Sequence, residues 1–177
     1  MKRILGILFL LAAVAIFGLR IQKGIQFKQN VSGYLERAAN ASTVELAHNE
    51  LTRSLGYLEA NGLTEGYTSI VYETPDEDIG FWYENLKAAQ QELAELPSNT
   101  SALERTNVLL KLRETLLDEG EKANVIVPEG LSVYPNNLLW AVLVQVALWG
   151  SFIYLMYWII EHDKRGKAKA AAAAATA

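Results

Sequence analysis

The sequence predicts an all-α membrane protein in which two transmembrane helices flank an extracytoplasmic antiparallel bundle of about four helices. Residues 4–19 and 138–160 are uncharged apolar runs near the two ends of the chain, and they predict the two spans. Between these runs, apolar residues recur every three or four positions, which is the spacing of amphipathic helices. Residues 67–72 and 124–128 are short and rich in β-branched side chains, so the prediction includes a small two-stranded ribbon.

Residues 1–19 are predicted to be an N-terminal transmembrane anchor that is not cleaved. Their apolar run of 16 residues is shorter than the roughly 20 that cross a bilayer core, but Arg3 and Arg20 can extend their charged ends to the interfaces. A basic start, a short apolar run and the small residues at 13–15 also match a cleaved secretory signal. We favour the anchor because the apolar run continues beyond those small residues to Leu19.

The second span is predicted over residues 137–160, and a short tail over residues 161–177. The uncharged run inside this span has 23 residues, which is enough to cross the bilayer as a helix. The tail is basic and ends in a run of alanines. Alanine favours helix but its methyl group carries no recognition chemistry, so the tail is interpreted as a cytoplasmic extension or linker.

Charge predicts which side of the membrane each part occupies. Residues 20–136 contain 18 acidic and 10 basic side chains, whereas both ends of the chain are basic. Basic flanks favour the cytoplasmic side, so both termini are predicted to be cytoplasmic and the central domain periplasmic or extracellular. Arg20 and Lys23 oppose this orientation because they directly follow the first span. The chain has no cysteine, so the outer domain is expected to be held by its own core or by partners rather than by disulfides.

The outer domain is predicted to contain about four helices. The first continues the N-terminal span outward, because a loose apolar stripe runs from Ile21 to Ala38. The others are expected over residues 42–61, 74–96 and 101–120, each with apolar residues three or four positions apart. An antiparallel arrangement follows from the short connections and from the need to return to the membrane.

Three motifs mark the predicted helix starts. Residues 42–45, 74–77 and 101–104 each place Ser or Thr three positions before Glu, which is the pattern of a capping box. In the second motif, Pro75 suits the first helical position, and the acids at 76–78 lie where the helix dipole favours negative charge. We interpret this acidic cluster as a helix start rather than a site, because a calcium loop needs alternating oxygen ligands, a Gly and a distant Glu.

Three consecutive aromatic residues follow this acidic start, namely Phe81, Trp82 and Tyr83. At 100° per residue they span about 200° of the helix circumference, so they cannot all face one core. Trp82 lies on the apolar stripe. Either Phe81 or Tyr83 packs under residues 67–72, or the helix presents aromatic surface to a partner. Because aromatic side chains are favoured interface anchors, we predict partner docking at these three positions.

The second span carries another candidate contact. Gln145 places a polar amide within the apolar run, with small residues near it. Such an amide tends to find a hydrogen-bonding partner on another helix, either the first span or a second subunit. Trp149 lies too deep for the aromatic belt at the membrane interface, so it is expected to pack against a helix or lipid. Gln145 and Trp149 are therefore added to the predicted docking residues.

The sequence carries no recognisable catalytic, cofactor-binding or metal-binding motif. A Gly-rich phosphate loop and a G-x-S-x-G nucleophile elbow are both absent. His48 follows Glu45 by three residues, but a di-metal bundle needs a second such pair and further carboxylates. No cofactor and no metal is therefore predicted. The acidic balance of the outer domain also disfavours nucleic-acid binding.

These observations favour a non-enzymatic structural protein, an accessory subunit or scaffold of a larger membrane protein complex. Its expected partners are the lipid bilayer and other membrane-protein subunits, in a hetero-complex or a homo-oligomer. The main alternative is a signal-sensing, receptor-like protein, which would pass its output to a partner because only 17 residues follow Ile160. A membrane-tethered enzyme is the third alternative, although no pair of carboxylates stands in an apolar setting suited to acid–base catalysis.

Overall fold

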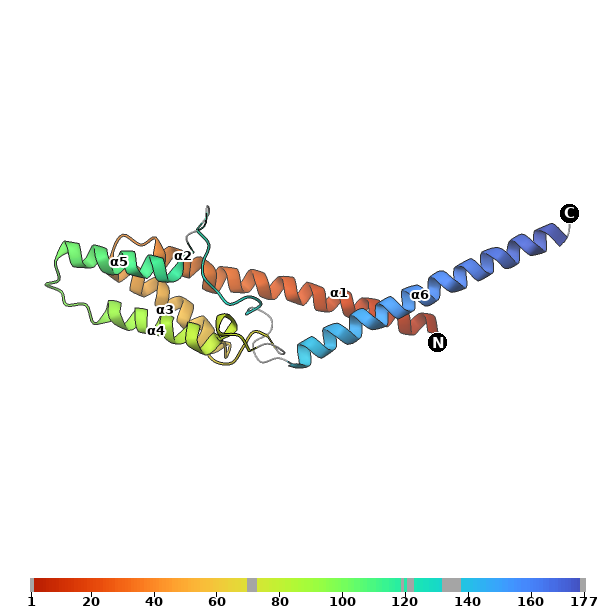
Figure 1. Ribbon diagram of the computed structural model, residues 1–177, viewed down its shortest axis with the longest axis horizontal. Coiled ribbons are helices and arrows are strands. Elements are labelled where there is room, and N and C mark those ends of the chain that lie inside the picture. The colour runs from red at the N-terminus through yellow and green to blue at the C-terminus, as the bar shows by residue number, and fades with distance from the viewer. Residues whose placement is uncertain (1, 70–72, 119, 121–122, 132–137, 176–177) are drawn as a thin grey trace. The chain divides into compact units, whose positions relative to one another are not determined.

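The computed structural model describes residues 2–69, 73–118, 120, 123–131 and 138–175. The chain is mostly helical, at 77%, and the described residues contain no strand, so the predicted helical fold is confirmed. It divides into two compact units, Met1–Arg20 with Leu139–Ala177 and Ile21–Leu138 (Figure 1). We call the first the terminal unit and the second the helical unit.

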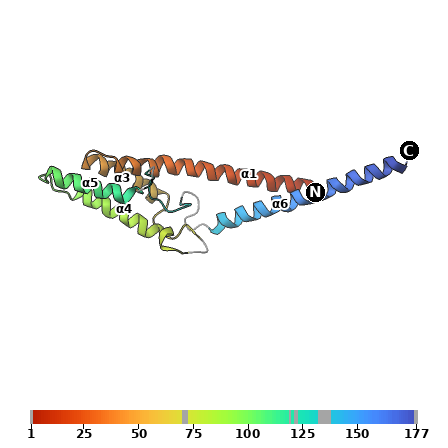
Figure 2. The ribbon, with the colours of Figure 1, turned by 45° about the horizontal axis from the view of Figure 1, so that its top comes forward.

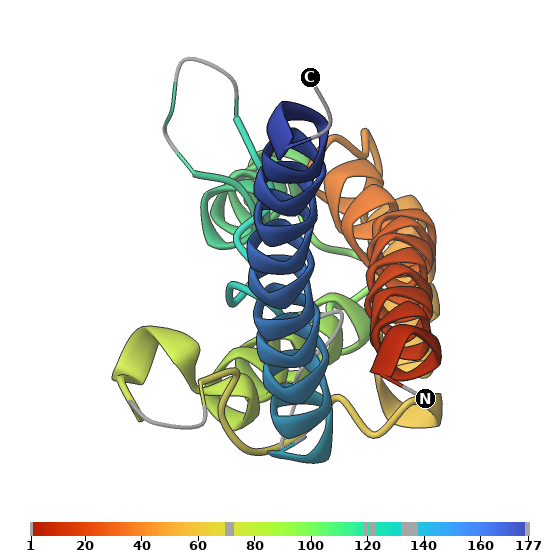
Figure 3. The same ribbon diagram turned by 90° about the vertical axis from the view of Figure 1, so that its right-hand side faces the viewer.

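Two helices are long and apolar enough to cross a membrane, and only 6% of each apolar window is buried. Helix α1 covers Lys2–Phe27 and helix α6 covers Leu138–Ala175, so each contains one of the predicted apolar runs. At 1.5 Å per residue, the 38 residues of α6 extend for about 57 Å, almost twice the ~30 Å bilayer core. The basic and Ala-rich tail therefore continues the second helix without a break (Figure 3).

Within the terminal unit, α1 and α6 approach closely at two glycines. The Phe9 ring of α1 lies against Gly150 of α6, where an added Cβ would stand 2.6 Å from Phe9 Cδ1. The Tyr154 ring of α6 lies in the same way against Gly6 of α1. Each helix thus places an aromatic ring where the other has no side chain, an arrangement that small residues permit in paired membrane helices.

The helical unit begins with the second part of the first helix. A π-helical segment, Lys28–Ser32, joins α1 to α2, Gly33–Ala39, and the path stays helical throughout. The remaining elements are α3 (Val44–Ala60), a 3-10 turn (Pro75–Glu77), α4 (Ile79–Ala94) and α5 (Ala102–Leu116). Helix α2 packs against α3 and α5, and α3 also packs against α4 (Figure 2).

One apolar core lies among these helices. Its largest fully buried apolar side chains come from every α-helix of the unit and from the last connection; they are Val31, Leu35, Leu51, Leu58, Ile79, Leu86, Leu116 and Leu131. Most of these residues recur at the helical spacing seen in the sequence. The apolar stripe predicted from Ile21 to Ala38 is buried only from Phe27 onward, and its earlier members Ile21 and Ile25 are exposed.

The structure confirms the helix cap predicted at Ser101 and shifts the one predicted at Ser42 by one residue. The capping box at Ser101 is confirmed: its Oγ accepts a hydrogen bond from Glu104 N at 3.2 Å, and Glu104 Oε2 accepts one from Ser101 N at 3.0 Å. The hydrogen bond from the Ser101 backbone, followed by that from its hydroxyl, lowers the pKa of the Glu104 carboxyl. The box predicted at Ser42 is wrong by one residue, because α3 is capped by Thr43, whose Oγ1 accepts from Leu46 N at 3.3 Å.

The start predicted at Thr74 is confirmed only for a short 3-10 turn, in which Thr74 is the N-cap residue and Pro75 the first residue, and it is wrong for α4. The residues after Thr74, Pro75–Glu77, form only this turn, and Thr74 makes no capping hydrogen bond. The helix proper starts after Asp78, whose Oδ1 accepts a hydrogen bond from Phe81 N at 3.0 Å. The capping function therefore belongs to the last acid of the cluster rather than to the threonine before it.

A backbone clamp from the preceding loop explains this shift. Ile79 N donates to Gly66 O at 2.8 Å, and Thr68 N donates to Glu77 O at 3.1 Å. These two bonds hold the chain in an extended conformation just before Ile79, so the helix cannot continue from the 3-10 turn. The constraint comes from residues about ten positions earlier, and a capping motif in the sequence does not reveal it.

The predicted two-stranded ribbon is absent from the described residues. Tyr67 forms an isolated bridge with Asp78, and Val125 forms one with Leu117. Among the described residues of these segments, Tyr67 and Val125 thus each bridge to the chain beside a helix end and not to each other. Residues 70–72, part of the first predicted strand, lie outside the described residues.

Replacing Asp78 with Ala should destabilise the helical unit, because the N–H of Phe81 then loses its acceptor. The expected loss is about 1 kcal/mol of unfolding free energy, measured by urea denaturation of the detergent-solubilised chain with tryptophan fluorescence. Thr74→Ala is the matched control and should cost much less, because Thr74 makes no capping bond. Equal losses from the two variants would contradict the cap assigned to Asp78.

Gly150→Leu should weaken the pairing of α1 and α6, because the new side chain would overlap the Phe9 ring. Overpacking of this kind costs roughly 1–3 kcal/mol, so near-ultraviolet circular dichroism in detergent should show a lower melting temperature. Gly18→Leu is the control, since nothing lies within 4 Å of a Cβ at that position. If Gly150→Leu melted like the unmodified chain, the two helices would not be paired through this contact.

Candidate docking site

Helix α4 sends its three consecutive aromatic side chains in different directions. Phe81 is 66% exposed, whereas Trp82 is 9% and Tyr83 is 6% exposed. Trp82 lies in the core, in keeping with its place on the apolar stripe. Tyr83 is also buried, so it offers no surface to a partner. Of the three aromatic residues predicted to dock a partner, Phe81 alone has its ring in solvent.

Tyr83 instead joins α4 to α3. Its hydroxyl donates a hydrogen bond to Glu59 Oε1 at 2.6 Å. This bond is the largest cause that raises the pKa of Tyr83 to about 12; burial and the negative charges of Glu59 and Glu84 act in the same direction. Tyr83 therefore has a structural function, since its neutral form ties two helices together.

Trp82 fixes the chain segment that lies beside α4. Its indole Nε1 donates a hydrogen bond to Ile126 O at 2.9 Å. Ile126 N in turn donates to Leu116 O at 2.9 Å, so both backbone polar groups of Ile126 are bonded. The Ile126 side chain stays 44% exposed. The segment is thus held against two helices while its apolar side chain remains accessible.

An open pocket of about 470 Å³ lies between the start of α4 and this segment, and we call it the acidic pocket. Phe81 and Ile126 stand on its two sides. The residues that line it are Pro75, Asp76, Glu77, Asp78, Phe81, Trp82, Asn85, Leu86, Thr115, Ile126, Val127, Pro128 and Glu129. The described part of its lining thus combines apolar side chains, the polar Asn85 and Thr115, and four carboxylates, with no basic residue.

The four carboxylates come from both sides of the acidic pocket. Asp76, Glu77 and Asp78 belong to the α4 side, and Glu129 belongs to the segment held by Trp82. Asp78 is occupied as the helix cap, and Glu77 Oε2 accepts a hydrogen bond from Thr74 Oγ1 at 3.1 Å. Asp76 and Glu129 are exposed. Among the described residues, neither of these two carboxylates is paired with a basic side chain.

The sequence pattern indicates only one side of the acidic pocket. Phe81 is conspicuous because it follows the acidic cluster and cannot share the stripe of Trp82. Residues 126–129 carry no such signal, since their β-branched composition favours a strand. Their position depends on a bond between residues 44 positions apart. The only local indication of this side of the pocket is the pair Ile126 and Val127 followed by Pro128 and Glu129, because the proline interrupts a strand and the glutamate adds a charge next to apolar residues.

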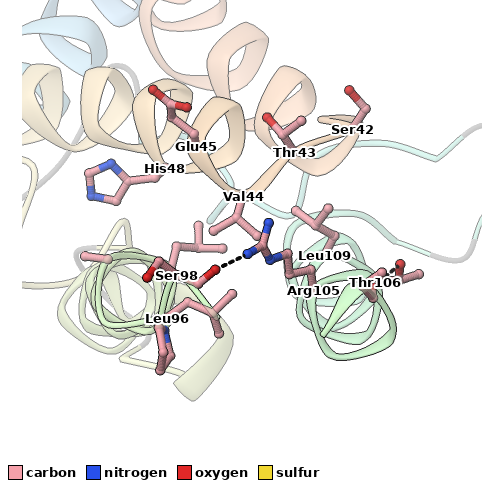
Figure 4. Close-up of a pocket in the computed structure, with 14 residues that line it drawn as sticks. Ser42, Thr43, Val44, Glu45, His48, Leu96, Ser98, Arg105, Thr106 and Leu109 are labelled. Atoms are coloured by element: carbon pink, nitrogen blue, oxygen red, sulfur yellow. Dashed lines mark hydrogen bonds between the residues drawn. The ribbon is translucent and has the colours of Figure 1, made fainter. Parts of the chain in front are cut away.

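A larger cavity of about 930 Å³ lies at the opposite end of α4 (Figure 4). It forms where the start of α3, the end of α4 and the start of α5 meet. Figure 4 shows Glu45 and His48 on α3, with Arg105 of α5 across the cavity. Arg105 Nη2 donates a hydrogen bond to Ser98 O at 2.6 Å. The cavity contains none of the predicted docking residues.

The chemistry of this larger cavity does not select one kind of ligand. Glu45 and Arg105 have opposite charges, and both are exposed to solvent. His48 is half-buried and adjoins apolar side chains. Across the described part of the chain, no three His, Cys, Asp or Glu side chains gather as a metal site would require. We therefore build the candidate site on the acidic pocket.

In the terminal unit, Gln145 and Trp149 both lie exposed on α6, Trp149 at 61%. The Trp149 ring meets Phe152 of the same helix edge-on, with 6.1 Å between ring centroids. Ala147 is instead 5% exposed, and Gly150 lies against α1. The residues that pair α6 with α1 are thus different from the two predicted docking residues. Within the described residues, Gln145 makes no hydrogen bond to α1.

Comparisons with known proteins found no matching family model, no matching curated protein and no matching solved structure.

Stability should depend on pH through Tyr83. A raised pKa means that its contribution is fully present below the ordinary value of 10.0 and is lost as pH rises through about 12. The unfolding free energy of the unmodified chain should therefore exceed that of Tyr83→Phe near neutral pH. The gap should narrow as pH rises from about 10 to about 12, which urea denaturation at several pH values measures. A gap independent of pH would contradict the Tyr83–Glu59 bond.

Proposed function

We propose that this chain is a non-enzymatic accessory subunit of a larger membrane protein complex, in which the helical unit is an extracytoplasmic docking domain. The observation that carries the proposal is Phe81, a large aromatic side chain that is 66% exposed and lines the acidic pocket. Aromatic residues beside a preformed pocket are typical anchors of protein interfaces. Ile126, at 44% exposed on the other side, adds to the same apolar surface.

Helices α1 and α6 anchor the subunit in the bilayer and supply a second contact there. Their own pairing uses the small residues Gly6 and Gly150. Gln145 and Trp149 face away from that pairing and are exposed. A polar amide on an exposed face of a membrane helix gains most from a hydrogen bond to another helix. This supports an interaction with a neighbouring membrane subunit.

The orientation follows from charge. The helical unit is acidic and the tail of α6 is basic. Basic residues beside a span favour the cytoplasm, so both termini are cytoplasmic and the docking domain is periplasmic or extracellular. Two of the basic tail residues pair along the helix, Arg165 with Glu161 and Lys167 with Asp163. These exposed pairs stabilise the helix only slightly and leave the positive balance of the tail unchanged.

A sensor function has weaker support. A sensor needs a ligand site, and the larger cavity beside Glu45 and Arg105 is the main candidate for one. Its charged side chains are exposed and of opposite sign, so they select no particular ligand charge. The acidic pocket combines one sign of charge with exposed apolar side chains, which suits a protein partner better.

The full-length chain, extracted from its native membrane in a mild detergent, should migrate in a complex with a protein mass well above its own 19.6 kDa. Phe81→Ala should release a large share of it as a lone chain. Truncating an interface anchor costs about 2 kcal/mol or more, which weakens binding by roughly 30-fold. Native electrophoresis and light scattering measure both effects.

Leu103→Ala is the matched control for this experiment. Leu103 is 71% exposed on α5 and does not line the acidic pocket, so its removal should leave the complex intact. A lone chain in the extract of the unmodified protein, with nothing bound to it, would contradict the proposed function.

A further inference from the structure

We infer that the acidic pocket receives a basic segment of a partner protein, which carries an apolar side chain together with positively charged residues. The inference rests on the proposed function, and it specifies the chemistry of the partner at that same site. It follows from three properties of the pocket: its charge, its exposed apolar side chains and its fixed walls.

Charge selects a basic occupant. Among the described residues, four carboxylates line the pocket and no basic side chain does. The two that are exposed, Asp76 and Glu129, have no basic partner among the described residues. The helical unit around them is also acidic, so its long-range field attracts a basic partner and repels an acidic one.

The two exposed carboxylates come from different segments of the chain that line the same pocket. Asp76 lies before α4, and Glu129 ends the segment held by Trp82. Phe81 and Ile126 are the exposed apolar side chains that line the same pocket. A partner that satisfies both features needs an apolar side chain for the pocket and nearby Lys or Arg side chains for the carboxylates. A small cation would satisfy the carboxylates but would leave the apolar surface in water.

The walls of the pocket are fixed before a partner arrives. The backbone N–H and C=O of Ile126 are bonded to Leu116 and to Trp82. On the other side, Asp78 caps α4 and the Gly66–Ile79 bond holds the turn before it. A partner therefore loses little binding free energy to ordering these residues, as is usual for pre-organised interfaces.

Site-specific photocrosslinking tests the inference on the full-length chain in its native membrane. Phe81→p-benzoylphenylalanine places the reactive group on the pocket, and mass spectrometry identifies the crosslinked fragment. We expect a fragment of another polypeptide that combines Lys or Arg residues with an apolar residue. The same reactive group at Leu103, which is exposed on α5 outside the pocket, is the control and should give no such fragment.

Charge removal provides the second arm. In the same crosslinking background, Asp76→Asn with Glu129→Gln should lower the yield of the crosslink about tenfold, and added salt should lower it in the unmodified chain. Glu36→Gln with Glu114→Gln removes the same charge from exposed positions that do not line the pocket, and it should leave the yield nearly unchanged.

Several results would overturn the inference. They are a crosslinked fragment that is acidic or neutral, a second copy of this chain, a crosslink to lipid alone, no crosslink, or equal yields from the two double variants. The size of the complex separates this failure from failure of the proposed function. A large complex without a basic crosslinked fragment refutes only the occupant of the pocket, whereas a lone chain refutes both.

Discussion

The candidate site depends on the hydrogen bond between the indole N–H of Trp82 and the carbonyl of Ile126. A buried indole needs an acceptor, and the carbonyls within α4 are engaged in the helix itself. The acceptor therefore comes from a distant segment, which is drawn against the start of α4. The same inward position of Trp82 turns its neighbour Phe81 outward, since successive residues differ by 100°. One buried side chain thus sets both sides of the acidic pocket.

The acids of the cluster before α4 differ in what they do, because of where the helix starts: Asp78 caps α4, and Asp76 lines the pocket. If Thr74 were the cap, all three acids that follow it would lie in the first helical turn and be explained by the helix dipole. The clamp from Gly66 moves the start to Ile79, so only Asp78 caps the helix. Asp76 remains outside the helix on the rim of the pocket. A backbone hydrogen bond from a loop thereby leaves the carboxylate of Asp76 exposed before α4 instead of within its first turn.

The features that could be predicted from the sequence are those that depend on neighbours within about four positions. The apolar runs, the helical periodicity and the Ser101–Glu104 box are of this kind. The pocket is not, because its second side rests on a bond across 44 positions. Tyr83 illustrates the same limit. Its position in the sequence is compatible with either the surface or the core, and the structure places it in the core, where its hydroxyl bonds to Glu59 on another helix. Phe81 could be predicted as a candidate docking residue, because its neighbour Trp82 lies on the apolar stripe and Phe81 cannot share that face of the helix.

The two exposed surfaces of this chain differ in the forces they use. Around Gln145 and Trp149, association in lipid depends on close packing and hydrogen bonds, which salt does not screen. At the acidic pocket, exposed carboxylates act through water and are screened over about 10 Å at 0.1 M salt. In a partner complex that used both surfaces, added salt would therefore weaken only the contact at the acidic pocket. In the proposed accessory subunit, the contact at Gln145 and Trp149 would be insensitive to salt and the contact at Asp76 and Glu129 would weaken as salt rises, and both would be needed to hold the complex together.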